Sequence, residues 1–165
     1  MSYRVAPTTA RGVRPDFRAS VTAGFKFLNT NLDPERIRAV MAYLSSLKPE
    51  RSPHRGKGER LNAAQQRGRA VFHGKGVCVD CHSGAIRTDL QAHEVGTAGD
   101  DEPGGTAFYT PKLIELYRTA PFLHDGRAPD LMSIFTEHNS EGAHGGASTL
   151  TPQELHDLVE FLLTL

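Results

Sequence analysis

Apolar side chains recur with helical spacing in two stretches of the chain, residues 33–47 and 151–165. In each stretch they occupy positions i, i+3, i+4, i+7 and i+10, which predicts an amphipathic helix with one buried face. Asp33 and Thr151 each precede a proline, as an N-cap followed by proline at the first helical position. Thr151 and Glu154 also match a capping box. We interpret the apolar positions as core faces; they are Ile37, Val40, Met41, Leu44 and Leu47, and Leu155, Leu158, Val159, Leu162 and Leu165.

The two helices close a partial internal repeat. Upstream of them, residues 12–21 align with 126–135, with Gly, Pro, Asp and Ser in register. Residues 1–50 are therefore expected to correspond to the C-terminal part of a module, without the N-terminal part of that module. Residues 51–61 are polar and punctuated by proline and glycine, which predicts a linker before a second module, 62–165.

The second module is expected to contain further helices and no strand. Asn62 is a suitable cap for a helix ending near His73, and another helix is predicted from about Asp130 to His138. Residues 83–109 show no periodicity and contain several glycines, which indicates a long loop. Such a loop in a compact domain is usually functional or packed on a cofactor. The predicted fold class is all-α.

Composition limits what the chain can be. Of its 165 residues, 38% are hydrophobic and none is Trp, so the hydrophobic core that the polypeptide alone can form is modest. The 16 glycines and 10 prolines indicate many turns. Lys+Arg and Asp+Glu both number 19, which gives no reason to expect nucleic acid or an anionic membrane as partner. No stretch reaches membrane-spanning length. Residues 1–20 lack the apolar region of a secretory signal peptide.

The run Cys78-Val79-Asp80-Cys81-His82 carries the chemistry. Two cysteines three positions apart and an adjacent histidine form the attachment motif of haem c, in which two thiols bond one porphyrin and the imidazole binds iron. A zinc site would need a second Cys/His pair at matching spacing. A thioredoxin-like redox pair would need a βαβ pattern around it. We therefore expect one covalent haem c with His82 as proximal ligand. Its assembly places the chain in the periplasm or otherwise outside the cytoplasm.

Residues 110–127, TPKLIELYRTAPFLHDGR, resemble the TP-x-L…T-AP-[YF]-x-HDG signature of the bacterial di-haem cytochrome c peroxidase and MauG superfamily. The resemblance covers about residues 62–165 and implies a cytochrome c fold with one covalently bound haem, preceded by a partial cytochrome-like helical segment. It also implies that His124 lies near a haem propionate and stiffens the distal loop. Arg118 and Arg127 are candidates to pair with propionates. Solvated surface arginines are the alternative for both.

The sequence offers several candidates for the second axial ligand. Where this superfamily usually places a methionine, the chain has His138, and bis-histidine coordination would lower the potential relative to His/Met. We expect His138 to bind the iron, with Met132 as the alternative. His93 and His144 also remain candidates, although His144 is expected on a loop surface. An open site is the last alternative.

A single haem motif favours electron transfer by a mono-haem chain within a multi-haem assembly. Its partners would be redox proteins or other cytochrome subunits. The alternatives are a subunit of a di-haem peroxidase or MauG-type enzyme, and a haem subunit that is purely structural. Peroxide chemistry needs an open iron position and acid/base groups beside it. The acidic loop 100–102 is expected to be solvated rather than to bind calcium, since the EF-hand pattern is missing.

Overall fold

The computed structural model describes residues 14, 16–99, 106–139 and 142–165, and the chain divides into two compact units, Met1–Pro49 and Glu50–Leu165. The acidic loop 100–102 lies outside the described residues. No helix in the described part of the chain is long and apolar enough to cross a membrane.

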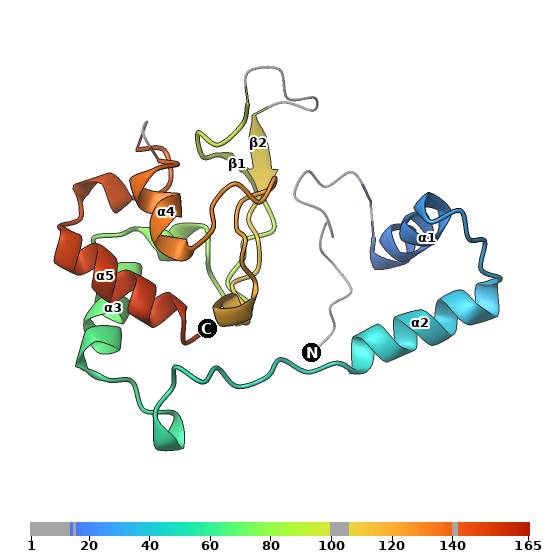
Figure 1. Cartoon of the computed structure of the whole chain (residues 1–165), viewed down its shortest axis with the longest axis horizontal. Coiled ribbons are helices and arrows are strands. Elements are labelled where there is room, and N and C mark those ends of the chain that lie inside the picture. Colours follow the sequence, from blue (N-terminus) through green and yellow to red (C-terminus); the bar gives the residue numbers. More distant parts are fainter. Residues whose placement is uncertain (1–13, 15, 100–105, 140–141) are drawn as a thin grey trace. The chain divides into compact units, whose positions relative to one another are not determined.

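The described residues of the first unit form two helices, α1 (Phe17–Phe27) and α2 (Pro34–Ser46), which contact each other (Figure 1). Asp33 caps α2 by accepting the N–H groups of Glu35 and Arg36, at 3.0 and 2.9 Å, so the predicted helix is confirmed. Helix α1 was not expected from the sequence. Its N-cap is Asp16, whose side chain accepts the N–H of Ala19 at 2.8 Å.

The second unit contains α3 (Ala63–His73), α4 (Leu131–Thr136) and α5 (Pro152–Leu162). All three helices were predicted, and each begins with a complete capping box, formed by Asn62 with Gln65, Asp130 with Ser133, and Thr151 with Glu154. Single 3₁₀ turns occur at Lys57–Glu59, Cys78–Asp80, Leu116–Arg118 and Ala147–Thr149. The unit is therefore mostly helical, as expected.

The core of the second unit lies where α3 crosses α5 (Figure 1). A Cβ on Gly68 would lie 1.8 Å from the carbonyl oxygen of Asp157, so only glycine permits this close crossing. Phe72 and Phe161 meet edge to face with ring centres 5.5 Å apart. Helix α4 packs against α5. The buried core residues are Phe72, Leu113, Leu116, Ala128, Leu131, Ile134, Leu150, Leu158, Phe161 and Leu162.

One short sheet corrects the expectation that no strand is present. Strand β1 (Ala92–Glu94) pairs antiparallel with β2 (Ala107–Tyr109), with His93 opposite Phe108. Each strand has three residues, which is too short for an alternating apolar pattern to be visible in the sequence. Both strands lie within the stretch 83–109 that was predicted to be a long loop.

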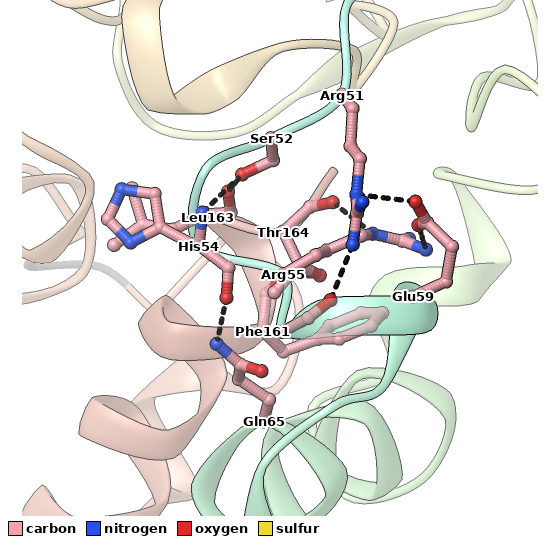
Figure 2. A network of polar contacts seen from close by, with 10 residues as sticks. Arg51, Ser52, His54, Arg55, Glu59, Gln65, Phe161, Leu163 and Thr164 are labelled. Atoms are coloured by element: carbon pink, nitrogen blue, oxygen red, sulfur yellow. Dashed lines mark hydrogen bonds and ion pairs between the residues drawn. The ribbon is translucent and has the colours of Figure 1, made fainter.

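The segment predicted to be a linker belongs to the second unit, where it is bonded to the end of α5 (Figure 2). The hydroxyl of Ser52 donates to the carbonyl of Leu163 at 2.6 Å, and Arg55 Nε donates to the carbonyl of Thr164 at 2.8 Å. Gln65 of α3 donates to the carbonyl of His54 at 2.9 Å. Residues 52–55 are thus fixed parts of the haem-motif unit rather than a free spacer.

The sequence repeat has a structural counterpart in the helix caps. Asp16 and Asp130 occupy aligned positions, and each accepts the backbone N–H three residues ahead. The aligned aromatic residues of the last helices differ in environment: Phe161 is 3% exposed, whereas Tyr43 is 64% exposed. In the second unit α3 covers this face of α5. Among the described residues of the first unit, no helix covers Tyr43 in the same way.

Candidate functional site

The haem motif forms one tight turn directly after α3. The N–H of Gly76 donates to the carbonyl of Val71 at 2.8 Å, and Val77 takes a left-handed conformation with φ 54°. The 3₁₀ turn Cys78–Asp80 follows, and the N–H of His82 donates to the carbonyl of Cys78 at 2.9 Å. This turn holds both thiols and the imidazole in one compact segment.

The two thiols differ in their surroundings. Burial raises the pKa of Cys78 to about 11, and its Sγ contacts the carbonyl of Gly76 at 3.3 Å. Burial also raises the pKa of Cys81, with the charges of Asp89 and Asp80 adding to the effect. Both thiols are therefore protonated at neutral pH. Neither has the depressed pKa typical of a reactive redox cysteine, which argues against a thioredoxin-like pair.

The ring of His82 is oriented by the loop that follows it. Its Nδ1 lies 3.2 Å from the carbonyl oxygen of Arg87, and as the donor to this carbonyl it leaves the Nε2 lone pair available. Burial lowers the pKa of His82, which keeps the imidazole neutral. A neutral imidazole with its second nitrogen hydrogen bonded is the usual form of a metal-binding histidine.

The imidazole of His144 lies near that of His82. Their ring centres are 6.5 Å apart, with the planes inclined by 33°. A ligating nitrogen lies about 2 Å from its metal and the ring centre roughly 1 Å further, so two axial imidazoles on one ion have centres about 6 Å apart. The observed separation therefore suits two imidazoles that share one iron. These side chains and the two thiols fit the requirements of a haem c.

Main-chain contacts hold the His144 loop beside the haem motif. The N–H of His144 donates to Asn139 Oδ1 at 2.9 Å, and the N–H of Gly146 donates to the carbonyl of Gly76 at 2.9 Å. A Cβ on Gly146 would lie 2.4 Å from the carbonyl oxygen of Lys75, so the two segments approach as closely as backbone allows. Burial, together with the charge of His82, lowers the pKa of His144 to about 4.

The position of His144 differs from the loop surface that was expected from the sequence. Its neighbours Gly145 and Gly146 suggested a surface loop, and the contact with Gly76, which lies 70 positions earlier in the chain, has no local signal. A pair of glycines can mark a close backbone approach as well as a loop. Gly145, with φ 61°, takes the left-handed conformation that glycine favours.

His138 and Met132 lie on or just after α4. The N–H of His138 donates to the carbonyl of Ser133 at 3.1 Å. Its Nε2 is buried and has no hydrogen-bond partner among the described residues. Unlike His144, His138 makes no ring contact with His82. The expectation that His138 or Met132 binds iron remains a prediction.

The candidate propionate contacts have other partners within the chain. Arg118 pairs with Glu115 at 2.5 Å and with Glu50 at 3.3 Å, and Arg127 pairs with Asp125 at 2.5 Å. These pairs are at least partly exposed, which matches the alternative of solvated surface arginines. Their role toward a propionate remains a prediction.

His124 packs on the short sheet. Its ring stacks on that of Phe108 in β2, with centres 4.0 Å apart and planes inclined by 25°. The pairing of Phe122 with Ala128 brackets the His-Asp-Gly turn, in which Gly126 has φ 76°. This arrangement gives His124 a role in ordering its loop. The proximity of His124 to a propionate remains a prediction.

His93, another candidate ligand, is engaged elsewhere. Its Nε2 lies 2.6 Å from Asp89 Oδ2, and potential metal-binding atoms of Cys81, Asp89 and His93 lie within 4.8 Å of one another. Burial opposes ionisation of Asp89, but hydrogen bonds from the Gln91 N–H and from His93 hold its pKa at about 2. The sequence did not indicate this cluster. Because a thioether bond would occupy the Cys81 sulfur, the cluster and haem attachment exclude each other at that atom.

No family model matches the chain. Among curated proteins, it is 33% identical over 184 residues to hydrazine synthase subunit gamma of Kuenenia stuttgartiensis, covering 86% of this chain and 52% of that protein. It is 32% identical over 130 residues to the methylamine utilization protein MauG of Methylorubrum extorquens, covering 67% of this chain and 36% of that protein. Cytochrome-c peroxidase IdrP2 of a Pseudomonas species is 28% identical to the chain over 187 residues, covering 85% of this chain and 51% of that protein. The chain thus spans about half the length of the curated relatives it matches most fully.

Solved structures agree with these matches. A chain of Kuenenia stuttgartiensis hydrazine synthase superposes with a TM-score of 0.81 at 28% identity, covering 89% of this chain and 61% of that one. A MauG-like protein associated with microbial copper homeostasis superposes with a TM-score of 0.62 at 22% identity, covering 78% of this chain and 55% of that one. This similarity shows a shared fold.

Proposed function

Because the chain belongs to the di-haem cytochrome c peroxidase and MauG superfamily, we propose that it is a c-type cytochrome that transfers electrons through one haem c. Cys78 and Cys81 would carry the two thioether bonds, and His82 would bind the iron. The observation that supports this proposal most is the separation of 6.5 Å between the ring centres of His82 and His144. Two such ligands would close both axial positions.

We propose His144, in place of His138, as the second axial ligand. The ring centre of His144 lies 6.5 Å from that of His82, a separation suited to one shared iron, and contacts with Asn139 and Gly76 hold the His144 loop there. His138 makes no ring contact with His82, although its buried Nε2 has no hydrogen-bond partner among the described residues and stays available to a metal. Met132 stays the alternative for a thioether ligand.

The chain's own groups prepare this site for electron transfer. When bound, haem c supplies one-electron redox chemistry. The carbonyl of Arg87 fixes the Nδ1 proton of His82, so that Nε2 is the basic nitrogen. Burial keeps both His82 and His144 neutral, the form in which an imidazole binds iron. Peroxide turnover needs an open iron position, which two histidine ligands do not leave.

A second candidate function is a subunit of a di-haem peroxidase or MauG-type oxidoreductase. Its support is the identity of the relatives, together with the fact that this chain spans about half their length. In that case the second haem would be held by sequence outside the residues present here. The partners in either case would be redox proteins or other cytochrome subunits. One relative is named as a subunit of hydrazine synthase. We propose a location outside the cytoplasm because haem c is assembled there.

Covalent attachment is tested first. The purified protein is expected to give the c-type pyridine haemochrome spectrum and to keep its colour after acid-acetone extraction. Its intact mass should exceed that of the 18.0 kDa polypeptide by one haem. A Cys78→Ala, Cys81→Ala double variant should lose covalent haem. Full extraction of haem from the unmodified protein would contradict the attachment.

Electron transfer is then separated from peroxide turnover. The haem-loaded protein should exchange electrons rapidly with small soluble mediators and turn over hydrogen peroxide negligibly. A His144→Ala variant serves as comparison, because it opens one axial position and should gain peroxide reactivity. Steady peroxidase activity of the unmodified chain would favour the enzyme assignment instead.

A further inference from the structure

Positive charge is concentrated in the segment that leads into the haem motif. Residues 50–75 contain seven Lys or Arg and two Asp or Glu, a net charge of +5, although the whole chain is neutral. Two of these cations are paired with residues of α5, Arg67 with Asp157 and Lys75 with Glu154. Carboxylates elsewhere in the chain therefore neutralise the segment only in part.

The outer face of α3 presents part of this charge to solvent. Its residues recur at i, i+3, i+4 and i+7, and all of them are exposed. They line an open hollow of about 360 Å³ and are Gln66, Arg69, Ala70 and His73. The other side of the helix, with Phe72, packs on α5. This outer face therefore takes no part in the core of the second unit.

Arg87 adds a second guanidinium beside Arg69. Burial lowers the pKa of Arg87, and the charges of Arg55 and Arg69 lower it further, so the three groups lie close enough to repel one another. Arg55 is paired with Glu59 (Figure 2). The side chains of Arg69 and Arg87 have no ion pair or hydrogen bond in the part of the chain that the structure describes. A carboxylate placed near both would relieve the repulsion and form charge-assisted hydrogen bonds.

Arg87 also connects this surface with the haem site. Its main-chain carbonyl is the acceptor for Nδ1 of His82 at 3.2 Å. Helix α3 ends at His73, five residues before Cys78. A protein bound to this surface would therefore lie beside the segment that carries the proximal ligand.

From these contacts we propose that the outer face of α3 and Arg87 together form the docking surface for an acidic redox protein. One electron would pass from the reduced centre of that protein to the ferric haem, or from the ferrous haem back to its oxidised centre. The inference rests on the proposed function, in which the chain transfers electrons. Arginine binds carboxylates in a bidentate manner and is enriched in protein interfaces. Encounters between redox proteins bury small areas, so one helix face and one loop residue are sufficient.

Stopped-flow reduction of the haem-loaded chain by flavodoxin, a small acidic redox protein, tests the proposal. Each reduced flavodoxin gives one electron to one ferric haem and is oxidised by one electron. Because charge complementarity raises association rates, Arg69→Glu should lower the second-order rate constant at low salt by about three-fold. The double variant Arg69→Glu, Arg87→Glu should lower it by about ten-fold. Both differences should vanish at about 1 M salt, where the screening length is about 3 Å.

Arg38→Glu is the matched control, because it makes the same charge change at an exposed position of α2. Its rate constant should stay close to that of the unmodified protein. An equal loss in Arg38→Glu and Arg69→Glu would show that net charge alone matters and would overturn the inference. If the double variant fails to take up haem, Arg69→Glu decides the question, because Arg69 is exposed and has no partner among the described residues to lose.

Binding is measured separately from electron transfer. Oxidised flavodoxin should shift the backbone amide signals of Gln66, Ala70 and His73 in nuclear magnetic resonance spectra. Unshifted amides, or an unchanged rate constant in Arg69→Glu, would overturn the inference. Amide shifts without electron transfer would support the docking surface and contradict only the proposed function. If Arg69→Glu weakens binding to phosphatidylserine vesicles and leaves the flavodoxin rate unchanged, the surface binds a membrane and the inference is overturned.

Discussion

The N–H of Gly146 donates to the carbonyl of Gly76 at 2.9 Å and thereby joins the loop of His144 to the segment that leads into the haem motif. Gly76 precedes Cys78 by two residues, and Gly146 follows His144 by two. This one contact relates the two histidines, which are 62 positions apart in the chain. The geometry of the proposed axial pair depends on it.

Replacement of Gly146 by alanine should disturb this contact. The new Cβ would lie 2.4 Å from the carbonyl oxygen of Lys75, so the two backbones would have to separate. Overpacking of this kind lowers the free energy of unfolding by about 1–3 kcal/mol. We also expect a smaller fraction of six-coordinate, low-spin haem in the absorption spectrum. Gly99→Ala is the control, because its Cβ would meet no atom of a described residue within 4 Å; a shift equal to that of Gly146→Ala would refute the explanation.

The repeat permits a matched comparison of two aromatic residues. Phe161 is 3% exposed and packs on Phe72, so Phe161→Ala should lower the free energy of unfolding by about 3–5 kcal/mol. Tyr43, at the aligned position of α2, is 64% exposed. Tyr43→Ala should therefore change the free energy of unfolding by less than about 0.5 kcal/mol. Chemical denaturation followed by circular dichroism measures both. A large loss for Tyr43→Ala in the isolated chain would mean that another surface covers this side chain in solution.

Asp157 gives a prediction about acid stability. Arg67 donates two hydrogen bonds to its carboxylate, at 2.6 and 2.8 Å, and these lower the pKa of Asp157 below the ordinary value of 3.8 despite the opposing effect of burial. A carboxylate with a lowered folded-state pKa stabilises the fold above its unfolded-state pKa. That contribution is lost as pH falls through the folded-state pKa.

The melting temperature of Asp157→Asn should therefore lie below that of the unmodified protein at pH 7. The difference should shrink as the pH falls below 3.8. Thermal unfolding measured at several pH values follows both proteins. A difference that stays constant down to pH 2 would show that packing, rather than the charge of Asp157, accounts for the effect.

Local signals in the sequence were sufficient for most of the helices. The caps at Asp33, Asn62 and Thr151 and the apolar spacing of α2 and α5 are short-range features, and the structure confirms them. Helix α1 was missed, although the aligned caps Asp16 and Asp130 were present in the repeat. The three-residue strands β1 and β2 were missed because their pairing is long-range and too short to leave a pattern.

The candidate site likewise contains residues that local spacing predicts and residues that only long-range contacts place. Cys78, Cys81 and His82 are contiguous, so their chemistry could be predicted from spacing alone. The position of His144 depends on the contact between Gly146 and Gly76, and that of His93 on its pairing with Asp89. Neither contact is encoded by local spacing. Spacing relative to a family signature favoured His138, whereas the geometry favours His144.

The resting ferric spectrum of His144→Ala, compared with that of His138→Ala, tests the central claim most directly. The unmodified haem-loaded protein should be six-coordinate and low-spin, without the near-infrared band of thioether ligation. His144→Ala should become high-spin or exchange its ligand, and His138→Ala should keep the unmodified spectrum. A low-spin spectrum that survives in His144→Ala and is lost in His138→Ala would contradict the account.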